Sequence, residues 1–147
     1  MPLVGSAARK WKWRIMVIEF FMDMLPPTAT FQAKGIVKKN GKPVVYESAE
    51  LKAARAKLSA CLAGHVPEKK YTGAVRLVAK WCFPISGRRK DGQYKTTKPD
   101  TDNLQKLLKD VMTKLGYWTD DALVASEIAE KFWAARPGIY IRIEELD

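Results

Sequence analysis

Residues 98–116 have the sequence KPDTDNLQKLLKDVMTKLG and contain the strongest pattern in the chain. From Asn103 to Leu115 apolar residues recur three and four positions apart, and Gly116 follows the last of them. Side chains at this spacing share one helix face, so the pattern predicts an amphipathic helix over about 103–115 that ends at the glycine. Its apolar stripe consists of Leu104, Leu107, Leu108, Val111, Met112 and Leu115.

Strand patterns and a second helix precede this segment. Residues 13–21 are rich in large apolar residues and residues 75–83 alternate apolar with other side chains, so both are predicted to be strands. Asn40-Gly41, between residues 35–39 and 42–46, predicts a hairpin with a type I′ turn, in which both central residues need positive φ. Ser48 can cap a further helix, which Gly64 ends.

The C-terminal part contains one ambiguous segment. The apolar positions of residues 122–133 fit helical and strand spacing only partially, so both remain open. Pro137-Gly138 predicts a turn into an alternating strand at 139–143, and we expect the two segments to pair as a hairpin if the first is a strand. The whole pattern predicts an α+β fold, a small mixed sheet with two main helices, as one domain over residues 1–147 with residues 1–12 as a flexible basic extension.

Composition narrows the classes of function. The 147 residues are 47% apolar, enough for one real core, and the net charge of +10 favours a polyanionic partner. Two cysteines and a single histidine argue against a disulfide framework, a zinc site or a histidine-based triad. Glu19 and Asp23 interrupt the apolar run at 15–25, so we expect no signal peptide, no membrane span and a cytoplasmic location.

Two carboxylates stand at the start of the predicted helix. Pro99 biases the preceding residue toward extended structure, where Asp100 and Asp102 would point the same way and converge. So close a pair repels unless a cation or the helix N-terminus compensates its charge. The alternative is simple N-capping, which we favour for one aspartate alone but not for the pair together with the acidic residues downstream.

Lys106 lies one helical turn after Asp102, on a helical wheel almost opposite the apolar stripe. One interpretation is a surface pair of these two residues, worth roughly 0.3–0.5 kcal/mol. The functional interpretation places the ammonium beside a metal site, where it can hold a phosphate or stabilise a leaving oxygen.

Two further carboxylates, Asp120 and Asp121, follow the predicted helix. Because a helix of this length spans about 20 Å, Asp121 reaches the first pair only if the chain folds back. A set of carboxylates without histidine suits a hard cation such as Mg²⁺ or Mn²⁺, which orients a water and neutralises phosphate charge. The expected chemistry is phosphoryl transfer to water.

Residues 98–106 and 116–122 together resemble the RusA family of Holliday junction resolvases. Those proteins carry an Asp-x-Asp-Asn-Leu-x-Lys segment, an amphipathic helix and then Gly-aromatic-x-x-Asp-Asp, all of which this chain matches. The resemblance extends through Pro26-Pro27-Thr28, the Asn40-Gly41 hairpin and the Ser48 helix, and so covers most of the chain after about residue 13.

The resemblance implies a magnesium-dependent endonuclease, with Mn²⁺ as a substitute, that resolves four-way DNA junctions by paired symmetric nicks in recombination and repair. It implies that Asp100, Asp102 and Asp121 bind the metal, that Lys106 is catalytic, and that Asp120 has a supporting role. It also implies a homodimer and a strand at residues 124–133. Some family members carry an arginine run directly before the first aspartate, whereas here residues 91–97 separate Arg88-Arg89-Lys90 from the segment of that aspartate.

The expected partners are branched DNA and a second copy of the chain, because a junction with near-twofold symmetry needs two matched nicks. The expected phosphate contacts are Lys34, Lys38, Lys39, Lys42, Arg88, Arg89, Lys90, Lys95 and Lys98. The alternative is a solvated basic hairpin and loop. The large aromatics could fill the core, which we favour, or the dimer interface: Trp81, Tyr117, Trp118, Phe132 and Trp133. Two other functions stay open, a nuclease of flap or duplex DNA and a non-catalytic nucleic-acid-binding module.

Overall fold

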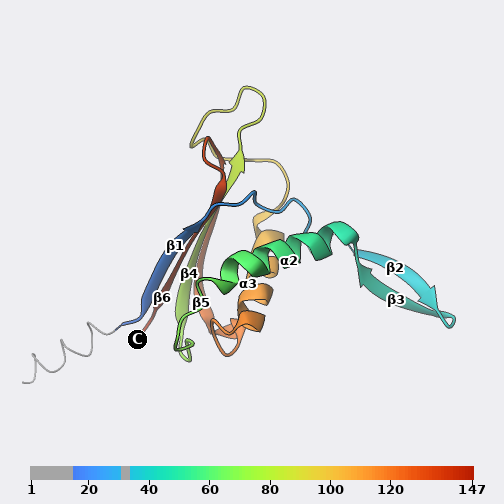
Figure 1. Ribbon diagram of the computed structural model, residues 1–147, viewed down its shortest axis with the longest axis horizontal. Helices are drawn as coiled ribbons and strands as arrows, with labels where there is room; N and C mark the ends of the chain where they lie inside the picture. Colours follow the sequence, from blue (N-terminus) through green and yellow to red (C-terminus); the bar gives the residue numbers. More distant parts are fainter. Residues whose placement is uncertain (1–14, 31–33) are drawn as a thin grey trace, which may run out of the picture.

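A mixed sheet, covered on one face by two helices, forms the body of the protein (Figure 1). The computed structural model describes residues 15–30 and 34–147, apart from the side chains of residues 34, 35 and 37. Within these ranges the predicted α+β architecture is confirmed. The expected N-terminal extension, residues 1–12, lies outside the described residues.

The sheet consists of β1 (Val17–Met22), β4 (Val75–Pro84), β5 (Val124–Ala134) and β6 (Gly138–Glu145), in the spatial order β1-β6-β4-β5. β6 is antiparallel to both of its neighbours, and β4 is parallel to β5. The ambiguous segment is therefore a strand, as the family resemblance implied.

The predicted hairpin between β5 and β6 is wrong, because β4 lies between them. The burial of the strand residues is consistent with this spatial order of the strands. The core-facing residues of β4 and β6 are almost all completely buried, and both strands have a neighbour on each side, whereas β5 carries Glu127, Glu130 and Lys131 and is an edge strand, as β1 is on the other side. Residues 135–137 carry the chain from this edge past β4 to the position of β6.

The two helices begin and end at residues with identifiable backbone roles. α2 (Ala49–Ala63) begins after Ser48, whose hydroxyl accepts a hydrogen bond from Leu51 N at 3.1 Å, as predicted. α3 (Thr101–Leu115) begins two residues earlier than expected and ends at Gly116, which has φ 90°. Its apolar stripe faces the sheet and is buried apart from Leu115, which is half-buried.

A two-stranded hairpin projects from the start of α2, away from the main sheet (Figure 1). It consists of β2 (Lys34–Lys39) and β3 (Lys42–Glu47). Asn40 has φ 52° and Gly41 has φ 77°, which confirms the expectation of positive φ at both turn residues.

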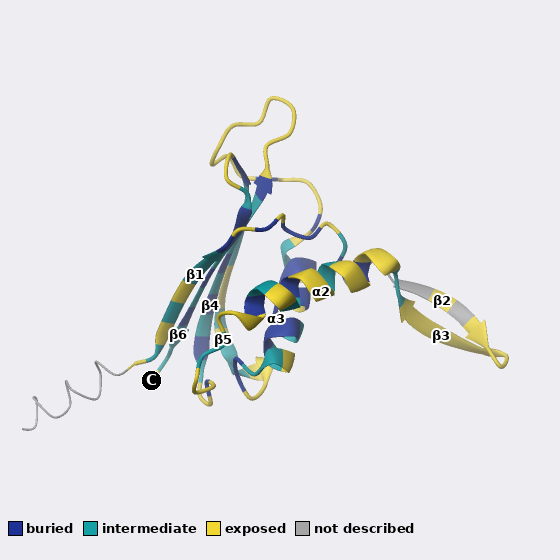
Figure 2. Ribbon diagram, viewed as in Figure 1, coloured by how far each residue is buried: buried dark blue, intermediate teal, exposed yellow. Residues whose placement is uncertain are grey.

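The core lies between the helices and the sheet, where Figure 2 shows the buried residues concentrated, whereas the hairpin and the loop after β4 are exposed. The core preference is confirmed for four of the aromatics, Trp81, Tyr117, Trp118 and Trp133. Phe132 is half-buried and stacks on Tyr94, with ring centroids 4.9 Å apart. None of the helices in the described residues is long and apolar enough to cross a membrane.

Gly138 makes the tightest backbone contact of the sheet, and we predict that Gly138→Ala destabilises the fold. The added Cβ would lie 2.2 Å from Phe21 Cζ and 2.6 Å from the carbonyl oxygen of Met22, and the backbone oxygen cannot rotate away. We expect chemical denaturation to show a loss of about 1–3 kcal/mol in the free energy of unfolding. The matched control is Gly73→Ala, whose Cβ meets nothing within 4 Å and should change that energy by less than about 0.5 kcal/mol. Equal stability of the two variants would contradict the prediction.

Candidate active site

Asp100 and Asp102 lie at the start of α3 and are both exposed. Asp100 is the N-cap residue, with φ −74° and ψ 148°, and Asp102 belongs to the first helical turn. The expectation that both stand in one extended segment is wrong, because the helix already begins at Thr101. They remain neighbours because Asp100 occupies the N-cap position of α3 and Asp102 lies in its first turn.

The capping alternative can be tested directly in this structure. Although Asp100 occupies the cap position, its carboxylate accepts no capping hydrogen bond. Asp120 and Ser48, by contrast, cap their helices through their side chains. The carboxylate of Asp100 therefore remains available for a ligand, whereas the side chains of Ser48 and Asp120 bond to the first turn of the helices that they cap.

Lys106 is exposed, as the helical wheel predicted. The surface pair with Asp102 is absent, since among the described residues neither side chain takes part in an ion pair or hydrogen bond. The start of α3 thus presents two carboxylates and, one turn later, an ammonium group, and no side chain of the described residues pairs with any of them.

Lys131 of β5 holds the chain segment that leads into α3. Its Nζ donates hydrogen bonds to the carbonyl oxygens of Thr97, at 2.7 Å, and Pro99, at 2.8 Å. These bonds fix the backbone directly before Asp100. The sequence patterns missed this positioning residue, because nothing near Lys131 in the sequence indicates that it bonds to backbone about thirty residues away.

Gln105 fixes the direction of α3 relative to β5. Its side-chain oxygen accepts a hydrogen bond from the indole Nε1 of Trp81 at 2.7 Å, and its amide nitrogen donates to Glu127 at 2.7 Å. Lys109 contacts the other oxygen of Glu127 at 3.1 Å. Glu127 therefore lies along the middle of α3 and Lys131 lies at its start, so β5 runs antiparallel to the helix.

Asp121 consequently lies at the other end of α3 from the first pair. It opens the short 3₁₀ helix η1 (Asp121–Leu123) directly before β5, and it is exposed. The carboxylate of Asp120 accepts a hydrogen bond from Ala122 N at 2.8 Å, which fixes this turn. α3 has 15 residues and is therefore about 22 Å long. Within the described part of the chain, no group of three or more His, Cys, Asp or Glu side chains is placed to hold a metal ion.

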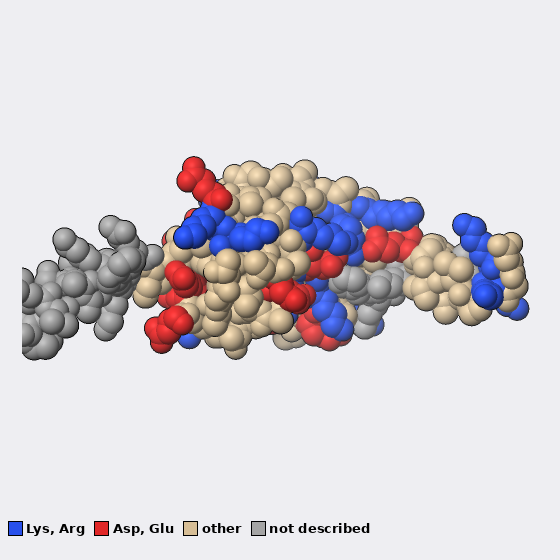
Figure 3. All heavy atoms as spheres, turned by 90° about the horizontal axis from the view of Figure 1, so that it is seen from below, with Lys and Arg blue, Asp and Glu red and all other residues tan. Residues whose placement is uncertain are grey.

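The predicted phosphate contacts form two separate groups. Lys38, Lys39 and Lys42 are exposed at the tip of the hairpin, where Figure 3 shows Lys and Arg gathered at the far end of the molecule. The second group lies in the loop between β4 and α3, where all predicted residues are exposed except one: Arg88, Arg89, Lys90 and Lys98. The exception is Lys95, only 9% exposed. The side chain of Lys34 lies outside the described part of the chain.

Comparison with known proteins places the whole arrangement in one family. The profile of the family described as Endodeoxyribonuclease RusA matches residues 25–144. The crossover junction endodeoxyribonuclease rusA of Lactococcus phage r1t is 33% identical over 135 residues, which cover 87% of this chain and 96% of the relative. The uncharacterized protein YqaN of Bacillus subtilis (strain 168) is 30% identical over 131 residues, or 82% and 91% of the two chains. The family match covers three of the four strands of the main sheet, both helices and the aspartates at both ends of α3, and the chain belongs to the RusA family of endodeoxyribonucleases.

Proposed function

We propose that this protein is a divalent-metal-dependent endonuclease that resolves four-way DNA junctions. One observation carries the proposal: in a chain of this family, Asp100, Asp102 and Lys106 stand exposed at the start of α3 without an ion pair to any described residue. The printed name of the phage relative, a crossover junction endodeoxyribonuclease, supports the choice of substrate. A capping role alone would not leave the carboxylate of Asp100 without a bond to the helix.

The residues at the start of α3 fit a hard divalent cation. Asp100 and Asp102 offer carboxylate oxygens, the donors that Mg²⁺ and Mn²⁺ prefer, and no lysine or arginine of the described chain is paired with them. When bound, such an ion supplies a water of lowered pKa and neutralises charge on the phosphate. Lys106, one turn further along the helix, is placed to hold a phosphate oxygen through its ammonium group.

We further propose that a C2 homodimer completes the ligand set. Asp121 lies about a helix length from Asp100 in the same chain, so it cannot share an ion with Asp100 and Asp102 of that chain. A twofold axis across the middle of α3 would set two such helices antiparallel, each start beside the other's end. Asp121 of the partner subunit would then join Asp100 and Asp102, and the dimer would carry two equivalent sites for two matched nicks.

The first test replaces one proposed ligand. Asp102→Asn removes a negative charge at almost constant volume, so we expect cleavage of a synthetic four-way junction in Mg²⁺ to fall by at least about 10³-fold. Junction affinity, measured by gel shift in EDTA, should be retained. Asp110→Asn on the same helix is the matched control, because Asp110 pairs with Arg55 and Lys114 and lies away from the start of α3. Normal nicking by Asp102→Asn would overturn the site assignment.

The shared site makes a sharper prediction for mixed dimers. We expect the Asp102→Asn and Asp121→Asn chains to be inactive separately and to regain activity when they are unfolded together and refolded as a mixture. In a mixed dimer both substitutions fall in the same site, and the second site contains only wild-type ligands. Because random pairing makes half of the dimers mixed, about a quarter of the wild-type number of sites should be restored.

The activity and the products of the mixed dimers distinguish a site shared between two chains from a site that belongs to a single chain. A dimer with one intact site should give single nicks rather than the paired symmetric nicks expected of the wild-type protein, as mapped on all four labelled strands. As a control, a mixture of Asp100→Asn and Asp102→Asn chains should stay inactive, because these substitutions fall on the same half of the site. If the Asp102→Asn and Asp121→Asn mixture also stays inactive while the dimer forms, each site belongs to a single chain.

A further inference from the structure

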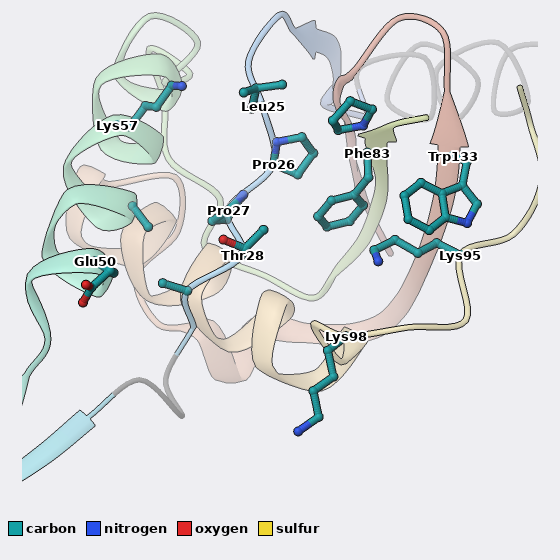
Figure 4. Close-up of a pocket in the computed structure, with 13 residues that line it drawn as sticks. Leu25, Pro26, Pro27, Thr28, Glu50, Lys57, Phe83, Lys95, Lys98 and Trp133 are labelled. Atoms are coloured by element: carbon teal, nitrogen blue, oxygen red, sulfur yellow. The ribbon is translucent and has the colours of Figure 1, made fainter. Parts of the chain in front are cut away.

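A cavity of about 460 Å³ opens beside the segment that leads into the proposed site (Figure 4). Its wall is largely apolar and comes from three directions, the diproline segment with Pro26, the start of α2 with Ala54, and the strand ends with Phe83 and Trp133. Lys98, two residues before Asp100, stands at its edge. This volume lies within the range of roughly 300–1,000 Å³ that is usual for ligand sites.

Positive charge dominates the polar groups of this cavity. Lys57, Lys95 and Lys98 line it, against a single acidic residue of the lining, Glu50, which stands across the cavity from Lys95 (Figure 4). None of the three lysines takes part in an ion pair with a carboxylate of the described residues. The cavity is therefore complementary to an anion that carries an apolar or aromatic group.

Lys95 is the one buried charged residue of the cavity lining, because Glu50, Lys57 and Lys98 are exposed. Its ammonium lies 4.3 Å from the centroid of the Trp133 ring and 5.2 Å from that of Phe83, and its side chain donates a hydrogen bond to the hydroxyl of Thr97. Burial lowers the pKa of Lys95, and the nearby Lys131 and Arg89 lower it further. A partly desolvated cation beside other cations is stabilised by an incoming anion.

We propose that this cavity receives one unstacked nucleotide of the DNA substrate, its base in the apolar interior and its phosphate on Lys95 and Lys98. The proposal rests on the proposed function and deepens it, because it names the feature of branched DNA that the protein recognises. A base leaves the stack at the lowest cost where pairing is already interrupted, whereas a continuous duplex pays a few kcal/mol for each extruded base. Since Lys98 directly precedes Pro99 and Asp100, the captured nucleotide would lie next to the phosphate to be cut.

Photo-crosslinking tests this placement. The probe is a duplex with a single bulged 5-iodouracil, compared with a fully paired duplex that carries the same base, both irradiated with the full-length protein in EDTA so that no strand is cut. We expect the bulged base to crosslink to the peptides that contain Phe83 or Trp133, and the paired base not to do so. Crosslinks only to exposed aromatics such as Tyr94 would overturn the proposal.

A cavity-filling variant and a matched neighbour sharpen the test. Ala54→Phe fills the cavity without a change of charge and should abolish these crosslinks and weaken binding of the bulged probe by about tenfold, the scale of one base–aromatic contact. Binding of the paired duplex should change by less than about twofold. Ala53→Phe adds the same ring at the adjacent exposed position, outside the lining, and should behave like the wild type. An unchanged preference of Ala54→Phe for the bulged probe would contradict the proposal.

Lys95→Gln provides a second measurement that does not depend on filling the cavity. For the bulged probe, loss of one phosphate contact should lower the slope of log affinity against log salt by about 0.7–0.9. The charge-matched control is Lys52→Gln, exposed on α2 and outside the lining, which should leave the slope unchanged. Equal slopes for the two variants would contradict the proposal. Crosslinks from a protein that does not cut junctions would refute the proposed function alone, and junction cleavage without crosslinks would refute the cavity alone.

Discussion

A buried indole N–H determines how the helix that carries the site lies on the sheet. Trp81 is completely buried in the central strand β4, and leaving its N–H without an acceptor would cost about 1–3 kcal/mol. Gln105 of α3 supplies that acceptor, and its amide then donates to Glu127 of β5. This short chain of hydrogen bonds locks the rotation of α3 and its direction along β5 at the same time. A helix held only by the packing of its leucine stripe could shift along its axis or rotate slightly without breaking a hydrogen bond.

The direction of α3 has consequences for the chemistry. Because β5 runs back along the helix, its last residues reach the segment before Asp100, where Lys131 bonds to the backbone, while its first residues carry Asp121 at the opposite end. The antiparallel packing of β5 along α3 therefore has two effects on the proposed site. It fixes the backbone before Asp100, and it places Asp121 at the other end of the helix. In the proposed dimer this separation becomes useful, since the site forms only when two chains meet. A single chain would offer two carboxylates and bind a divalent ion weakly.

Local signals in the sequence predicted the elements and the β2–β3 hairpin, but not how the strands of the main sheet pair. The leucine stripe of α3, the Asn40-Gly41 turn and the Ser48 cap each depend on neighbours within a few residues, and all three are confirmed. The predicted pairing of β5 with β6 failed because strand order depends on which strands bury both edges, a property of the whole sheet. Lys131 was missed for the same reason.

The candidate site was predictable to a similar extent. The exposed position of Lys106 follows from helical periodicity, whereas the position of Asp121 relative to Asp100 depends on the path of β5, which no local pattern encodes. Lys95 was expected on an open basic loop, but it is buried and its ammonium lies over the Trp133 ring instead. The aromatic partner lies on another strand, so the sequence around the lysine contains no sign of this contact.

The distribution of charge gives a physical account of how a polyanion could approach an acidic site. On the sheet face that the helices leave open, basic side chains are largely paired, as Arg76 and Arg142 are with Glu144. Among the described residues, cations without an ion pair instead gather on the hairpin tip (Figure 3) and in the loop after β4, where they contribute to long-range attraction. Asp100 and Asp102 on their own would repel a phosphate. Lys98 and Lys106 flank the pair along the chain and offset this repulsion, and a bound divalent ion would neutralise the two carboxylates. In the proposed function, attraction at the periphery would bring DNA to the domain, and the short-range charges at the start of α3 would decide whether a phosphate can remain there.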